Sequence, residues 1–255
     1  MKHVVMFSGG VGSCMTAKRV AEAHGSDDTI LLFADTMMED EDLYRFLEAA
    51  SDKLGVSLER IADGRTPWQV FNDQKFMGNS RVDLCSRILK RELLDRWVEE
   101  KFTPDEVVCY VGIDWTEIHR FERMAPRKLP YIYKAPMCDP PLLMKPEMLE
   151  ALYKDGIAVP RLYSMGFPHN NCGGFCVKAG QGHFKMLLDQ MPERYAYHEE
   201  QERLFREKTG KNVSVMKDRR GGQVRPLTMK DLRLRSERNE EIDMFDLGGC
   251  GCAID

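Results

Sequence analysis

The alternation of short apolar runs with longer amphipathic stretches, from the first residue to Gly112, constrains the fold more than any other feature. The apolar runs have strand length and predict β-strands at residues 3–7, 29–34, 56–61 and 107–111. The stretches between them predict helices at residues 14–24, 41–54 and 86–101. Strands and helices that alternate in this way are typical of an α/β fold with a doubly wound parallel sheet. We therefore expect a functional site beyond the carboxyl ends of these strands.

The second half of the chain is less regular. Six prolines between positions 126 and 146 predict an extended loop after the fourth strand. Further helices are expected at residues 145–154, 177–190 and 193–208. The chain is thus predicted to have three parts: a nucleotide-binding α/β domain at 1–140, a mostly helical region with a cysteine loop at 141–210, and a basic arm with a cysteine tail at 211–255.

Composition excludes several classes of function. Lys and Arg total 37 against 41 Asp and Glu, and the net charge of −4 argues against a protein that wraps nucleic acid with a basic surface. Hydrophobic residues make up 43% of the chain, which suits a folded globular protein. Because no apolar run approaches the roughly 20 residues of a membrane helix and the N-terminus lacks a signal-peptide pattern, we expect a cytoplasmic protein without membrane contact.

The first predicted strand runs directly into Ser8-Gly9-Gly10-Val11-Gly12-Ser13, a loop whose composition suits an anion. Glycines let the backbone turn tightly and bring its N–H groups close to a phosphate. The helix behind the loop adds the positive end of its dipole, and the two serines add hydroxyl donors. The ending of a Walker P-loop is absent, which argues against a GTPase or motor-type ATPase. A tight strand–helix turn without a ligand is the alternative.

This loop and three later segments resemble the PP-loop ATP pyrophosphatase (adenine nucleotide α-hydrolase-like) superfamily, and most closely its PAPS reductase-like branch. FADT at residues 33–36 is similar to the Asp-Thr segment after the second strand of that branch. LCSRILK at residues 84–90 is similar to its Cys-x-x-x-x-Lys segment, which opens a helix. GIDWTEIHR at residues 112–120 is similar to its Gly-x-Arg-x-x-Glu-Ser…Arg block. The resemblance extends over residues 1–190.

The resemblance implies a bound adenine nucleotide, ATP with Mg²⁺. The implied nucleotide-binding residues are Ser8, Gly9, Gly10, Gly12 and Ser13, with Asp35 beside the adenosine or the metal. It also implies that Arg87, Lys90 and Arg120 are catalytic cations that stabilise charge on phosphate or sulfate oxygens. For Arg87 and Lys90 the alternative is an ordinary exposed helix surface. Two positions depart from the family: Gly12 stands where ATP-cleaving members usually have Asp, and Asp114 stands where the block has its first Arg.

Eight cysteines without a signal peptide suggest metal or sulfur chemistry rather than disulfides. Cys172 and Cys176 lie in a glycine-rich segment that lets both thiolates face one ion. Iron–sulfur members of the branch use cysteines at the start of the Lys90-type helix and a close pair downstream, so the resemblance implies a [4Fe–4S] cluster at Cys85, Cys172 and Cys176. Cys138 is our candidate for the fourth ligand. Zinc in the same site, or no metal, is the alternative.

The chain ends with two further cysteines in the sequence Gly-Gly-Cys-Gly-Cys at residues 248–252. Reductases of the branch carry a nucleophilic Cys on a flexible tail, so the resemblance implies a catalytic role for Cys252; metal binding or delivery by the tail is the alternative. Residues 217–238 carry eight basic and three acidic side chains. They are either a solvated arm or a docking surface for nucleic-acid phosphates. His169 and His183 are expected at ordinary polar positions.

Three functions remain open from the sequence. The first, which we favour, is an ATP-dependent sulfur-handling enzyme that adenylates an oxygen of a nucleobase or nucleic acid and transfers sulfur from a cluster or a cysteine. The second is a PAPS/APS-type sulfonucleotide reductase that releases sulfite. The third is a non-catalytic, nucleotide-binding regulatory module with a structural metal. A sulfur or electron donor protein is the expected partner of an active enzyme, and an oligomer is compatible with the sequence.

Overall fold

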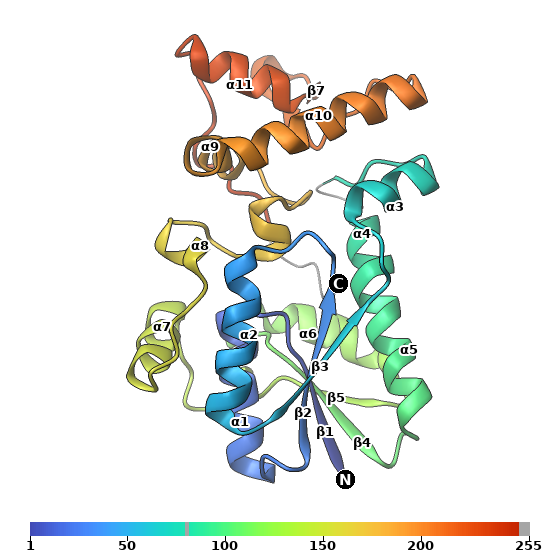
Figure 1. Cartoon of the computed structure of the whole chain (residues 1–255), viewed down its shortest axis with the longest axis vertical. Helices are drawn as coiled ribbons and strands as arrows, with labels where there is room; N and C mark the ends of the chain where they lie inside the picture. The colour runs from blue at the N-terminus through green and yellow to red at the C-terminus, as the bar shows by residue number, and fades with distance from the viewer. Residues whose placement is uncertain (80–81, 250–255) are drawn as a thin grey trace.

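The structure is a computed structural model that describes residues 1–79 and 82–249. The chain forms an α/β fold around a five-stranded sheet, in which all strands are parallel and the order is β3-β2-β1-β4-β5 (Figure 1). The strands are β1 (Lys2–Met6), β2 (Thr29–Asp35), β3 (Ser57–Ala62), β4 (Val107–Val111) and β5 (Ile132–Lys134). The predicted α/β class and parallel sheet are confirmed, and the strand order is compatible with a doubly wound fold.

Helices cover both faces of the sheet (Figure 1). One face packs on α1 (Val11–His24), α2 (Glu41–Leu54) and α7 (Lys145–Lys154). The other face packs on α5 (Glu92–Lys101) and α6 (Ile118–Met124). The central strands β1 and β4 are almost entirely buried, as strands covered on both faces must be, and this explains their nearly continuous apolar sequence.

The helix that begins at Leu84 contains a π-helical turn. α4 (Leu84–Ser86), η1 (Arg87–Arg91) and α5 follow one another without a break. The Glu92 N–H donates to the Arg87 carbonyl, five residues earlier, as in a π-helix. Residues five apart would point about 140° away from each other on an α-helix. The wider turn brings Cys85 and Lys90 to the same cavity.

A second hydrophobic core lies beyond the carboxyl ends of the strands and joins residues 68–89 with residues 162–232. Figure 1 shows its helices stacked above the sheet. Its elements are α3 (Pro67–Gln74), α8 (Arg161–Ser164), α9 (Gln181–Gln190), α10 (Pro192–Thr209), β6 (Met216–Asp218), β7 (Arg225–Leu227) and α11 (Met229–Glu237). Short 3₁₀ turns complete the described chain at η2 (Trp115–Glu117), η3 (Ala125–Lys128), η4 (Pro136–Cys138), η5 (Asn171–Gly174) and η6 (Arg220–Gly222). This second core therefore contains residues from all three predicted parts of the chain, 1–140, 141–210 and 211–255.

The segment expected as a basic arm is folded over most of its described length. β6 and β7 form an antiparallel hairpin, and α11 packs beside α9 and α10. The buried carboxylate of Glu202 on α10 accepts the N–H groups of Val215 (3.0 Å) and Met229 (2.6 Å) and so joins this segment to the core. Sequence periodicity missed these elements because their apolar residues are spread over a short hairpin and one short helix.

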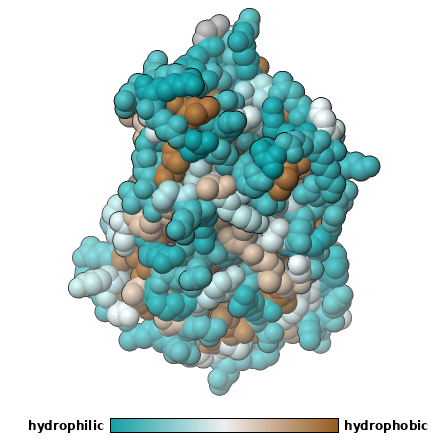
Figure 2. All heavy atoms as spheres, turned by 45° about the horizontal axis from the view of Figure 1, so that its top comes forward, coloured by the Kyte–Doolittle hydropathy of each residue, from teal (hydrophilic) through white to brown (hydrophobic). Residues whose placement is uncertain are grey.

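Two further differences concern element boundaries and surface. The helix expected at 177–190 begins at Gln181, because Ala179 pairs with Gly248 and extends the backbone there. β5 was not expected, because its three residues lie inside the proline-rich stretch. Within residues 1–79 and 82–249, none of the helices combines the length and apolar character that a membrane crossing requires. Figure 2 shows a face where hydrophilic residues predominate and hydrophobic patches are small.

Candidate functional site

The phosphate loop, residues 8–13, joins β1 to α1 at the carboxyl edge of the sheet. Ser8 Oγ lies 3.3 Å from Ser13 Oγ, and Ser13 Oγ donates to the Gly10 carbonyl at 2.9 Å. Gly9 has a φ of +73°, and a Cβ there would lie 2.3 Å from Leu43, so the turn requires glycine. Among the described side chains, none caps the start of α1. Its first-turn N–H groups are therefore left for solvent or an anion.

The phosphate loop also touches the end of β4, backbone against backbone. A Cβ on Gly12 would lie 2.7 Å from the Gly112 carbonyl oxygen, and a Cβ on Gly112 would lie 2.5 Å from the Ser13 nitrogen. Neither contact can be relieved by rotating a side chain, because each involves a backbone atom. β1 and β4 are neighbours whose connections lead to opposite faces, which is where doubly wound folds bind ligands. Close packing at this point accounts for glycine at position 12.

The phosphate loop opens into a cavity of about 260 Å³, which we call the loop cavity. Besides the loop, its lining includes Asp114, Glu117, Arg120, Lys145, Tyr163 and His169. His169 is only 7% exposed, and neither ring nitrogen has a hydrogen-bond partner among the described residues. Burial, followed by the charge of His183, lowers the pKa of His169 to about 3, so the imidazole is neutral. Its two unpartnered nitrogens make His169 a candidate ligand-binding residue rather than the ordinary polar position that was expected.

Asp35, expected beside the nucleotide or its metal, is instead bound within the protein. Its buried carboxylate accepts hydrogen bonds from the Met37 N–H (2.8 Å), the Tyr44 hydroxyl (3.1 Å) and Arg60 Nε (2.9 Å). It is not part of the lining of the loop cavity. These contacts hold the chain after β2 in place, and a role of Asp35 beside a nucleotide or its metal stays a prediction.

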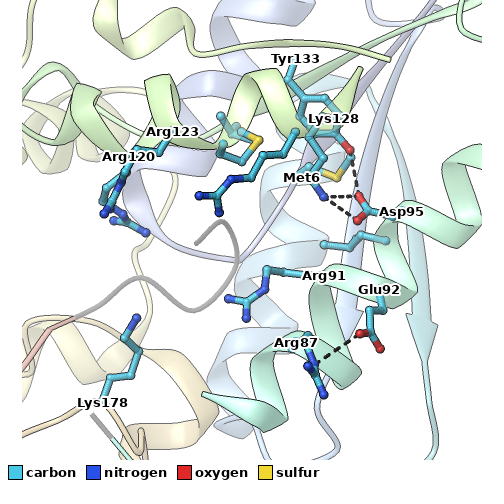
Figure 3. A pocket seen from close by; sticks show the side chains of 14 residues that line it. Met6, Arg87, Arg91, Glu92, Asp95, Arg120, Arg123, Lys128, Tyr133 and Lys178 are labelled. Atoms are coloured by element: carbon cyan, nitrogen blue, oxygen red, sulfur yellow. Dashed lines mark hydrogen bonds and ion pairs between the residues drawn. The ribbon is translucent and has the colours of Figure 1, made fainter. Parts of the chain in front are cut away.

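A larger, cationic cavity of about 490 Å³ lies at the ends of β1 and β4, toward the α5 and α6 face (Figure 3). Two carboxylates line it, Glu92 and Asp95. Seven cations line it: Arg87, Arg91, Arg120, Arg123, Arg127, Lys128 and Lys178. Figure 3 shows Arg91, Arg120 and Lys178 reaching toward its middle from three segments.

Ion pairs among the described residues neutralise part of this charge. Arg87 pairs with Glu92 (3.4 Å), and Lys128 pairs with Asp95 (2.5 Å). Two carboxylates outside the lining take part as well: Asp83 lies 3.0 Å from Arg91 and 3.7 Å from Lys178, and Glu117 lies 2.8 Å from Arg120. Within the part of the chain that the structure describes, seven cations thus meet four carboxylates. This balance of the described charges favours an anionic ligand.

Sequence reasoning found only Arg87 and Arg120 of this set. Spacing offered a further signal, because Arg87 and Arg91 are four apart and Arg120, Arg123 and Arg127 are three or four apart, which places each group on one side of a helix. The basic residues of 217–238 are also partly neutralised. In that stretch Arg220 and Arg235 share Asp218, and Arg233 pairs with Glu199 and Glu237.

A third, small cavity is lined by three of the four predicted metal ligands, Cys85, Cys172 and Cys176; we call it the cysteine cavity. Its volume of about 10 Å³ is close to the smallest that admits a water molecule. Lys90 also lines it and forms an ion pair with Glu39 at 3.3 Å. Since Lys90 is 5% exposed, the alternative of an ordinary surface position is wrong for this residue.

Two local features hold the thiols at this cavity. The Thr36 hydroxyl donates to Cys172 Sγ at 3.8 Å. Cys172 has a φ of +49°, in the left-handed region that non-glycine residues avoid, and the two glycines that follow also have positive φ. Such strain at a non-glycine residue is a common mark of functional sites. Ser86 Oγ, another buried lining atom, has no hydrogen-bond partner within the described chain.

Cys138, expected as a fourth ligand, is placed elsewhere. Its Sγ lies 3.5 Å from the Ile113 carbonyl, and it packs with the core on the α5 and α6 face. Burial, together with the charges of Asp114 and Asp139, raises the pKa of its thiol and disfavours the thiolate that a metal needs. Cys252, expected to be catalytic, and Cys250 lie outside the described residues.

The described residues do not fit a metal cage as they stand. Within residues 1–79 and 82–249, no group of three or more His, Cys, Asp or Glu side chains has the arrangement of a metal site. The cysteine cavity, at about 10 Å³, is also too small for the core of a [4Fe–4S] cluster. Cys85, Cys172 and Cys176 are thus brought together as three thiols around one small cavity.

The three cavities share residues and adjoining segments. Arg120 lines both the loop cavity and the cationic cavity. The helix from Leu84 to Arg91 lines the cysteine cavity through Cys85 and Lys90, and the cationic cavity through Arg87 and Arg91. Comparison of the chain with protein-family models and with curated proteins gave no match.

Proposed function

We propose that this protein is a PP-loop ATP pyrophosphatase-type sulfurtransferase, which adenylates an oxygen of a nucleobase or nucleic acid and replaces that oxygen with sulfur. The observation that carries the proposal is the adjacency of the three cavities. An anion-binding loop at a helix N-terminus, a cationic cavity and a trio of thiols suit ATP, a phosphate-bearing acceptor and a sulfur carrier, respectively.

In the first step, the acceptor oxygen attacks the α-phosphorus of ATP. A bond forms between that oxygen and phosphorus, and the bond from the α-phosphorus to the bridging oxygen breaks, so pyrophosphate leaves. We assign the pyrophosphate to Ser8, Ser13 and the first N–H groups of α1, which line the loop cavity. Arg120 lines both cavities, so we assign it the stabilisation of charge that develops between ATP and acceptor. Bound Mg²⁺ would supply further charge neutralisation to the phosphates.

In the second step, a persulfide on one cysteine of the cavity attacks the activated carbon. A carbon–sulfur bond forms, and AMP leaves with the original oxygen. A second thiol of the cavity then attacks the sulfur–sulfur bond, which releases the thiolated product and leaves a disulfide. A donor of sulfane sulfur forms the persulfide, and a thiol reductant reduces the disulfide and restores both thiols, so the cycle requires both partners.

The experiment is to incubate the full chain with ATP, Mg²⁺, thiosulfate as the sulfane-sulfur donor and dithiothreitol as the reductant, with and without transfer RNA or DNA oligonucleotides as acceptors, and to measure pyrophosphate and AMP. We expect both products to form in equal amounts and to depend on Ser13. The cationic cavity would also suit a sulfonucleotide, so sulfite release from APS or PAPS with thioredoxin is measured in parallel. Sulfite without pyrophosphate would replace our proposal with a reductase. Tight nucleotide binding without either product would replace it with a regulatory module.

A further inference from the structure

The two departures from the family pattern, Gly12 and Asp114, line the same cavity. We propose that Asp114 supplies the carboxylate that holds the Mg²⁺ of bound ATP, in place of the acid that position 12 lacks. The inference rests on the proposed function, because it assumes that a nucleotide occupies the loop cavity.

Position 12 has no room for an acidic side chain. Any Cβ there would meet the Gly112 carbonyl oxygen at 2.7 Å, and this oxygen belongs to the backbone at the end of β4. The segment that blocks position 12 also carries Asp114, two residues further on. The loop cavity therefore has no carboxylate at position 12, but it has one at Asp114 on another wall.

The carboxylate of Asp114 is held in a fixed position with one oxygen to spare. Its Oδ1 accepts hydrogen bonds from the Thr116 N–H (2.9 Å) and the Thr116 hydroxyl (2.5 Å), which cap the turn η2. Oδ2 takes part in neither bond, and Asp114 forms no ion pair with a cation of the described chain. Glu117, the other carboxylate of this segment, is paired with Arg120 at 2.8 Å. Asp114 is thus the acid of the cavity best able to bind a metal ion.

An independent observation indicates that this cavity is built for a ligand. His169 lines it with both ring nitrogens unpartnered among the described residues, although the side chain is 7% exposed. Mg²⁺ in nucleotide sites is usually held by one or two carboxylates together with substrate phosphates and water, rather than by a full protein cage. One fixed carboxylate facing a phosphate-binding loop satisfies that requirement.

The test compares metal-dependent and metal-independent binding of α,β-methylene-ATP, an analogue whose α–β bridge cannot be cleaved. In Asp114→Asn the amide oxygen still caps η2, so the substitution removes the charge and keeps the turn. By calorimetry, we expect the analogue to bind this variant without metal about as well as it binds wild type. The tightening that Mg²⁺ causes in wild type should be lost. The affinity of Mn²⁺ for the complex with the analogue, measured by electron paramagnetic resonance, should fall about tenfold or more.

Glu122→Gln is the matched control, since it removes an exposed carboxylate from the following helix α6 and should leave metal dependence unchanged. Asp114→Ser, which also retains a capping oxygen, is the second variant if Asp114→Asn does not fold. An Asp114 variant that folds and keeps the wild-type response to Mg²⁺ and Mn²⁺ would overturn the inference alone. Wild-type protein that does not bind α,β-methylene-ATP in either condition would overturn the proposed function as well.

Discussion

Replacing Gly12 with alanine tests how closely the phosphate loop packs against β4. The new Cβ would lie 2.7 Å from the Gly112 carbonyl oxygen, and both positions belong to backbone that no rotamer change can move. Overpacking of this kind costs about 1–3 kcal/mol. Because Gly12 lies in α1, alanine also gains about 0.5–1 kcal/mol of helix stability. The expected net loss in the free energy of unfolding is about 1–2 kcal/mol.

Thermal unfolding by circular dichroism measures this loss directly. For a chain of this length, 1 kcal/mol corresponds to a change in Tm of about 2–4 °C, so Gly12→Ala should lower Tm by about 2–8 °C. Gly10→Ala is the matched control in the same loop, because its Cβ would meet Ser8 Oγ at 3.4 Å and the Tyr163 hydroxyl at 3.6 Å, which are ordinary contacts. If Gly12→Ala unfolds at the wild-type temperature or above it, the backbone contact is not as close as inferred and the argument for glycine at position 12 fails.

Four further predictions concern the cavities and the buried histidines. Ser13→Ala should weaken nucleotide binding about 10- to 100-fold, from the loss of a hydrogen bond to charged phosphate, and leave persulfide formation from a sulfur donor intact. Cys172→Ala should do the reverse, and equal loss of both properties in both variants would show that the two sites are not separate. Arg127→Gln in the cationic cavity should weaken oligonucleotide binding, measured by fluorescence anisotropy, and reduce the slope of log affinity against log salt concentration by about one. Arg225→Gln in strand β7 should change neither, and the opposite ranking would indicate that residues 217–238 form the docking surface. Burial lowers the pKa of His198 to about 3, so the unfolded chain binds a proton that the folded chain excludes. The free energy of unfolding should therefore fall as pH drops from 6.5 toward 3. Urea unfolding of His198→Gln should show a smaller fall, and an unchanged pH dependence would contradict a lowered pKa of His198. The [4Fe–4S] cluster stays a prediction, and it is checked by measuring iron, zinc and acid-labile sulfide after purification without oxygen. Near-stoichiometric iron and sulfide would support the cluster, whereas one zinc without sulfide would support a structural metal.

Elements with strong local patterns were predictable from the sequence. Helix α2 is an example: buried Leu43, Phe46, Leu47 and Ala50 follow helical spacing, Asp40 caps its start and Gly55 ends it in the left-handed region. The strands β1, β2 and β4 were equally visible, because both faces are buried and their apolar runs are continuous. β5, β6 and β7 have three residues each, too short for any period to emerge.

The candidate site was predictable to the extent that it is local. The phosphate loop is one contiguous segment, so its glycines and serines predict anion binding without knowledge of the fold. Cys85 and Cys172 are 87 positions apart, and only the family resemblance suggested that they meet. The same resemblance suggested Asp35, and Cys138 was our own candidate for a fourth ligand; the structure places them in contact with Arg60 and Ile113, respectively. A family resemblance predicts which residue stands at a position, but it does not predict which neighbours that side chain contacts.

By itself, the sequence determined the parallel α/β scaffold and the position of the phosphate loop, because hydrophobic periodicity and glycine-rich turns act over a few neighbouring residues. The tertiary structure alone decided which charges and thiols share a cavity. The cationic cavity draws on residues from Met6 to Lys178, and the contact that requires glycine at position 12 joins it to a residue 100 positions away. Such assemblies depend on strand order and helix packing, and these are set by the burial of the whole core rather than by any local stretch of the chain.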